Sequence, residues 1–169
     1  MKNIAKNNLH IILATFSFFV LQIIVSPLLS IYNIAPDFML ILVITYATLN
    51  DHIPSMLYAF IVGIFMDLYL STNFGSLTLQ YLLASFIASY FKFNSVYYIK
   101  QFIYKFIFVV FIASITSSLS FLFLNQTIVS YLFFYNFINL VIFNNLYNVI
   151  IAFIIITILP GKLFYEIKW

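Results

Sequence analysis

Charged residues are scarce in this 169-residue sequence: four acids and seven lysines make up 7% of it, whereas 65% of the residues are hydrophobic. A typical globular chain is about a quarter charged, so this chain has too few charges to cover a water-facing surface. The absence of cysteine excludes disulfides, thiolate nucleophiles and cysteine-bound metals. The absence of arginine argues against bidentate phosphate recognition, and the few lysines do not indicate a nucleic-acid partner. The composition predicts an integral membrane protein.

Apolar stretches recur along the chain, some of them shorter than the ~20 residues that a helix needs to cross a bilayer. We expect an all-α fold in which six transmembrane helices form one domain over residues 1–169. The predicted helices cover residues 9–29, 36–49, 54–70, 75–91, 101–124 and 140–159. The first is longer than the apolar part of a usual signal peptide and no cleavage pattern follows it, so we expect it to be retained. Residues 125–139 form either an interfacial segment or an extension of the last helix.

The lysines predict how the helices are oriented. With six crossings, both termini lie on one side of the membrane, and all seven lysines fall on that side. The opposite loops, at residues 30–33, 71–74 and 125–136, contain none. Because cytoplasmic loops are enriched in positive residues, we expect a multi-pass protein with both termini in the cytoplasm.

Two acids, Asp37 and Asp67, fall within predicted helices, and the topology places both near the outer face. Carboxylates inside a membrane are costly, which makes them functional candidates. Asp37 is placed to cap the start of its own helix. No lysine is available on that side, so Asp67 must find hydroxyls or the amides near Gly75, or stay protonated. A structural network and a partner or switch role remain equal alternatives for Asp67.

Small residues repeat every four positions along the third predicted helix, at Ser55, Ala59 and Gly63, and Asp67 continues the series. Small residues at this spacing let helix backbones approach closely in lipid. We therefore expect this stripe to pack against a neighbouring helix of the same bundle.

Three amides, Asn144, Asn145 and Asn148, fall in the outer half of the last predicted helix. Buried amides in a membrane form hydrogen bonds between helices. Alternatively, the three could line a polar, outward-facing cavity together with Asp37 and Asp67. Both interpretations stay open at this point.

The sequence offers no set of residues for catalysis. His10 and His52 fall at the predicted cytoplasmic ends, far from Asp37 and Asp67, so no histidine–carboxylate pair can form at the outer face. Neither histidine has the neighbours of a metal site. With only three glycines, the chain has no phosphate-binding loop or dinucleotide fingerprint. We expect a protein that is not an enzyme and that has no cofactor or metal.

Three motifs occur in order over residues 35–91: a Pro36–Asp37 pair, Gly63 followed by Asp67 and leucine, and residues 71–75, which end in glycine. In this order and spacing they resemble the MreD family, the small membrane proteins of the bacterial rod-shape system, or elongasome. The resemblance assigns partner or packing roles to Pro36, Asp37, Gly63, Asp67 and Gly75.

The resemblance implies a non-catalytic scaffold in the bacterial cytoplasmic membrane that helps MreC and the peptidoglycan synthases to maintain rod shape during cell-wall elongation. The implied partners are MreC first, then RodA, a class B penicillin-binding protein and, indirectly, MreB, within the lipid bilayer.

The implied fold is similar to the six-helix substrate-binding components of energy-coupling-factor transporters. This likeness supplies the alternative function, a component that binds a vitamin or another small molecule for transport. A generic small transporter or lipid-facing regulator is a third reading. The transport components dock their partner through an Ala-x-x-x-Ala pair on the first helix, whereas here Phe18 stands four residues after Ala14. We therefore favour the scaffold.

Overall fold

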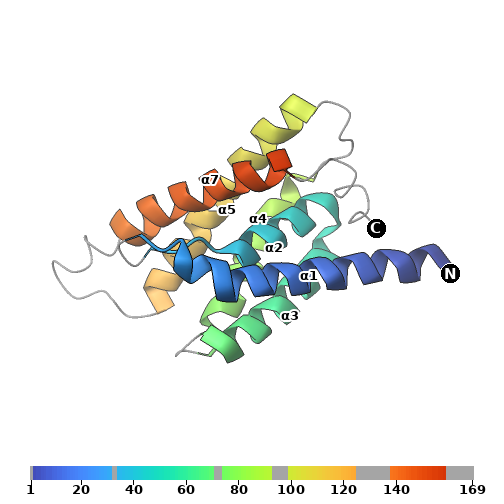
Figure 1. The fold of residues 1–169 in the computed structure, drawn as a ribbon, viewed down its shortest axis with the longest axis horizontal. Helices are drawn as coiled ribbons and strands as arrows, with labels where there is room; N and C mark the ends of the chain where they lie inside the picture. Colours follow the sequence, from blue (N-terminus) through green and yellow to red (C-terminus); the bar gives the residue numbers. More distant parts are fainter. Residues whose placement is uncertain (1, 32–33, 71–73, 93–98, 125–137, 159–169) are drawn as a thin grey trace.

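The computed structural model describes residues 2–31, 34–70, 74–92, 99–124 and 138–158. Within these residues the chain forms six α-helices and one π-helical segment, and no β-strand (Figure 1). The elements are α1 (Lys2–Leu28), α2 (Phe38–Leu49), α3 (His52–Leu70), α4 (Ser76–Tyr90), α5 (Ile99–Leu124), η1 (Ile138–Phe143) and α7 (Asn144–Ile158). The predicted all-α class is confirmed.

Helix α2 lies at the centre of the bundle. All 12 of its residues are buried, and it contacts α1, α3, α4, α5 and α7. The reason is in its sequence, since a helix that is apolar on every side has no face suited to water. At ~1.5 Å per residue, α2 is only about 18 Å long, shorter than a ~30 Å hydrocarbon core. Because other helices surround it, α2 need not match that thickness.

Helices α1 and α7 run roughly along the long axis of the molecule, while α5 crosses it obliquely (Figure 1). Each helix overlaps one of the six predicted ranges, although α1 begins at Lys2, seven residues before the predicted start. Residues 138–139 are π-helical and continue directly through η1 into α7. The rest of the predicted interfacial or helical segment, residues 125–137, lies outside the described residues.

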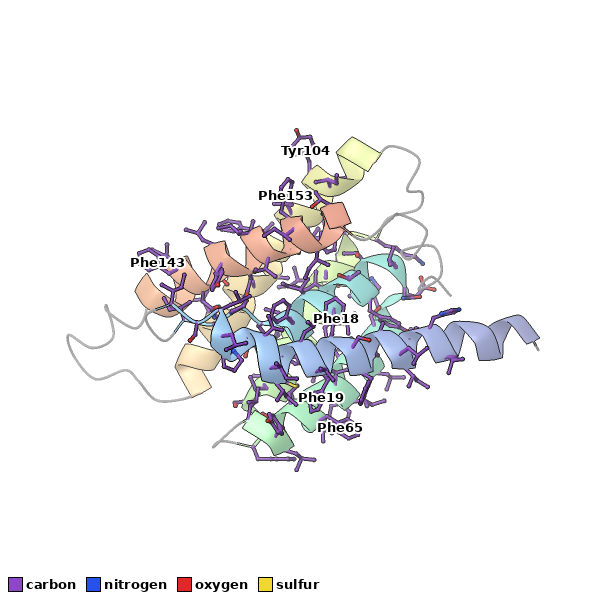
Figure 2. All side chains as sticks on the ribbon, in the orientation of Figure 1. Phe18, Phe19, Phe65, Tyr104, Phe143 and Phe153 are labelled. Carbon is purple, nitrogen blue, oxygen red and sulfur yellow. The ribbon has the colours of Figure 1, made fainter. Side chains whose placement is uncertain are left out.

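Two helical stretches are long and apolar enough to cross a membrane, Leu9–Leu28 of α1 and all of α3. Shorter apolar helical stretches occur at residues 38–49, 103–116 and 141–157. Many large apolar side chains lie on the outside of the bundle. Figure 2 shows Phe65, Tyr104 and Phe143 pointing away from it. The outer surface therefore suits lipid, while the number of crossings and their direction stay predictions.

Candidate functional site

The carboxylate of Asp67, near the end of α3, caps the start of α4. Its two oxygens accept four hydrogen bonds: from the backbone amides of Gly75, Leu77 and Thr78, at 2.9–3.0 Å, and from the Thr78 hydroxyl. Asp67 is 2% exposed. The sequence offered hydroxyls or the amides near Gly75 as hydrogen-bond partners of Asp67, and in the structure Asp67 binds both kinds of group.

Local backbone geometry explains why the cap comes from another helix. Gly75 is the N-cap residue of α4, and its φ of +94° lies in the left-handed region that favours glycine. A glycine has no side chain with which to accept the free amides of the first helical turn. The Asp67 carboxylate supplies that acceptor, and its negative charge suits the positive end of the α4 dipole.

Gly63 lies one helical turn before Asp67 and faces Thr78 of α4, which also donates hydrogen bonds to Asp67. A Cβ atom built on Gly63 would lie 2.5 Å from the Thr78 Cα atom, closer than real Cβ contacts. The other members of the small stripe, Ser55 and Ala59, are also buried. Gly63 and Asp67 therefore act as one structural unit. The glycine allows α4 to approach α3, and the carboxylate binds the end of α4 that has approached.

The second acid, Asp37, caps α2, as its position in the sequence predicts. Its Oδ1 atom accepts the amide of Leu40 at 2.9 Å. The hydroxyl of Tyr81, on α4, donates to both carboxylate oxygens of Asp37 at 3.0 and 3.2 Å. Tyr81 lies one turn after Thr78, so the two acids bind adjacent turns at the start of α4.

The backbone just before α2 is held by three polar side chains from α1 and α7. The Asn148 side-chain oxygen accepts the Asp37 amide at 2.8 Å, and the Gln22 side-chain oxygen accepts the Phe38 amide at 2.7 Å. The Ser26 hydroxyl donates to the Pro36 carbonyl at 2.7 Å. Four helices, α1, α2, α4 and α7, therefore meet at the Pro36–Asp37 pair.

The asparagines of the last helix contribute in different ways. Asn145 is fully buried, donates to the Val141 carbonyl and accepts from Ser118 of α5 at 3.1 Å. Asn148, 1% exposed, binds Asp37. The side-chain oxygen of Asn144 is buried and has no hydrogen-bond partner among the described residues. Hydrogen bonding between helices accounts for two of the three, and a polar outer cavity stays a prediction.

A separate polar cluster lies at the opposite ends of the helices. Lys92, just after α4, donates to Asp51 between α2 and α3, with 2.5 Å between the two atoms. This hydrogen bond and the positive charge of Lys92 lower the pKa of the Asp51 carboxyl below its ordinary value. The imidazole of His52 forms a hydrogen bond with the Ser89 hydroxyl on α4.

The acceptor capacity of Asp37 and Asp67 is directed at the protein itself: helix amides, a tyrosine and a threonine. Among the residues that the structure describes, no three histidine, cysteine or acidic residues are grouped as metal ligands would be. This arrangement can lock helices together at one end of the bundle, and it leaves the large apolar faces of α1, α3 and α7 exposed.

Comparison with known proteins adds a family. The profile of the family described as rod shape-determining protein MreD matches residues 2–165, nearly the whole chain. The chain belongs to the MreD family. A search of curated proteins gave no match, and a search of solved structures gave none either. MreD membership implies a role in rod shape determination and, together with the apolar helices, identifies a membrane protein.

The MreD-like motifs now have positions in the structure. The Pro36–Asp37 pair joins four helices, Gly63 and Asp67 join α3 to α4, and Gly75 begins α4; residues 71–73 lie outside the described residues. Sequence reasoning missed Gln22, Thr78 and Tyr81. Only Gln22 gives a signal, because it is a lone amide within a long apolar stretch.

Proposed function

We propose that this MreD-family chain is a non-catalytic membrane scaffold of the elongasome that binds MreC and, with it, the peptidoglycan synthases. The match over residues 2–165 carries the proposal. The geometry supports it because the side-chain oxygens of Asp37 and Asp67 accept hydrogen bonds from helix amides and hydroxyls of the bundle itself. RodA, a class B penicillin-binding protein and MreB are the further partners that we propose.

The proposed topology has six crossings, with both termini in the cytoplasm of a bacterial cell. Exposed large apolar side chains occur on α1, α3, α4, α5 and α7, which supports a bundle surrounded by lipid. In this topology the Asp37 and Asp67 end of the bundle faces outward, where the large extracytoplasmic part of MreC would begin.

The alternative is a component that binds a small molecule for transport, with a fold similar to energy-coupling-factor components. No solved structure matches the chain, so this likeness has no support from comparison. The buried and paired state of Asn145 and Asn148 also favours the scaffold, because their polar atoms are used between helices.

Site-directed cross-linking tests the scaffold proposal, because the chain has no native cysteine. Single cysteines would replace Phe16 on α1, Phe65 on α3 and Phe153 on α7, which are 66%, 63% and 48% exposed. We expect one of these three outer faces to cross-link to a cysteine placed in the membrane helix of MreC. The matched control is Ala59→Cys, because Ala59 is fully buried and should not react.

Equal yields at all three outer faces, no higher than with an unrelated membrane protein, would contradict the scaffold proposal. Co-purification with an energy-coupling ATPase complex in place of MreC would favour the transport alternative.

A further inference from the structure

A pocket lies at the end of the bundle opposite to Asp37 and Asp67, between the end of α4 and the first turns of α5. Its volume is about 390 Å³, and it is lined by Phe91, Lys92, Lys105, Phe108 and Val109. Ligand sites in proteins have volumes of roughly 300–1,000 Å³, so this one has room for a small group. Among the residues that the structure describes, its lining combines two cations with three apolar side chains.

The two lysines differ in their availability. Lys92 already pairs with Asp51. Lys105 is exposed, and no carboxylate among the described residues pairs with it. The ammonium group of Lys105 is therefore free to bind an anion. The ammonium group of Lys92 can interact with the same anion while it stays paired with Asp51. Such a site attracts negative groups and disfavours choline or ethanolamine groups.

The apolar lining points to the other half of the ligand. The rings of Phe91 and Phe108 meet edge to face, with 6.2 Å between their centroids, and both residues are partly exposed, at 41% and 56%. Val109 is fully buried and forms part of the lining. A hydrated inorganic anion would gain nothing from these rings, whereas a hydrocarbon chain would cover them.

The depth of the pocket suits the surface of a membrane. Lys105 lies six residues into α5, or about 9 Å from its start at ~1.5 Å per residue. Lys92 directly follows Phe91 at the end of α4. The lysine distribution assigns this end to the cytoplasm. Basic pockets between helices on that side of a membrane bind the head groups of anionic lipids.

We infer that this pocket binds one anionic phospholipid, with its phosphate on Lys105 and Lys92 and an acyl chain along Phe91 and Phe108. The site is separate from the proposed MreC scaffold function and does not depend on it. A lipid bound here would pack between α4 and α5 and cover the exposed parts of the Phe91 and Phe108 rings.

Native mass spectrometry of the full chain released from detergent tests this inference. The probes are phosphatidylglycerol and phosphatidylcholine with matched acyl chains. We expect tighter binding of phosphatidylglycerol, and about a fivefold loss of that affinity in Lys105→Gln, since one lysine near an anionic surface contributes about that factor. Lys105→Arg keeps the charge and should retain the affinity.

Lys6→Gln is the matched control, because it removes one positive charge from α1, a helix that contributes none of the described residues of the pocket lining. Its affinity for phosphatidylglycerol should equal that of the wild type. Thermal unfolding in phosphatidylcholine nanodiscs verifies that Lys105→Gln folds, which its exposed position favours.

Three results would overturn the inference. Equal affinity for the two lipids would show that the head-group charge is not recognised. Equal losses in Lys105→Gln and Lys6→Gln would show a general charge effect in place of a site. Displacement of phosphatidylglycerol by inorganic phosphate at millimolar concentration would show a site for free anions and not for a lipid.

Discussion

Replacing Asp67 by alanine tests the proposed cap most sharply. The change removes an acceptor of four hydrogen bonds, three of them from backbone amides at the start of α4. Loss of an N-cap acceptor costs about 0.5–2 kcal/mol, and each buried donor left without a partner costs about 1–3 kcal/mol. Relief of the carboxylate's own desolvation offsets part of this loss. We expect Asp67→Ala to lower the free energy of unfolding by about 3 kcal/mol.

Asp67→Asn separates the two oxygens. Oδ2 accepts three of the four hydrogen bonds, and Oδ1 accepts only the Leu77 amide. An asparagine whose oxygen takes the Oδ2 position keeps those three, while its NH₂ group faces the Leu77 amide, so that two donors meet. We expect a loss of about 1–2 kcal/mol, between wild type and alanine.

The assay is thermal unfolding of the purified chain in detergent, together with membrane abundance and recovery of MreC for the same samples. A chain of this size loses about 2–4 °C in Tm per kcal/mol, so Asp67→Ala should unfold about 6–12 °C lower. An unchanged Tm for Asp67→Ala, or a lower Tm for Asp67→Asn than for Asp67→Ala, would contradict the role of Asp67 as the cap of α4. A fall in MreC recovery beyond the fall in abundance would add a partner role to the structural one.

Three further predictions concern other parts of the bundle. Gly63→Ala should destabilise the fold by about 1–3 kcal/mol, because the new Cβ meets the Thr78 Cα atom at 2.5 Å; an unchanged Tm in detergent would show that α3 can move away without loss. Lys92→Gln should raise the pKa of Asp51 toward its ordinary value in an NMR titration. The Lys92–Asp51 pair stabilises the folded chain above the ordinary Asp pKa, and this contribution is lost as the pH falls through the lowered pKa. Equal Asp51 pKa values in the wild type and in Lys92→Gln would contradict the pairing. In intact cells, an impermeant thiol reagent should label Phe74→Cys, which is 71% exposed, but should label Asp51→Cys only after lysis; the reverse pattern would invert the topology.

Sequence reasoning predicted the helices well because long apolar runs, prolines and polar links mark where they begin and end. It placed Asp37 correctly as a helix cap, since that role depends only on neighbours in the chain. It could not show that all of α2 is buried in protein, because lipid and a protein core select the same apolar side chains.

Contacts between distant parts of the chain were harder to predict. The amides near Gly75 were one of several alternatives for Asp67, and neither Thr78 nor Tyr81 stood out, because helical spacing does not say which neighbour each face meets. Of the residues before α2, Pro36 and Asp37 could be singled out by motif, but the hydrogen bond from the Asp37 amide to Asn148 joins positions 111 residues apart. Such pairings depend on how the helices pack, which local sequence does not determine.

Depletion of this protein in its own bacterium, followed by microscopy of cell shape and of tagged MreC, tests the proposed scaffold role most directly. We predict that rods become round as the protein disappears and that MreC loses its normal distribution in the membrane. Re-expression of the wild-type chain should restore both. Cells that remain rods of normal width, with MreC unchanged after the protein is gone, would contradict the proposed function.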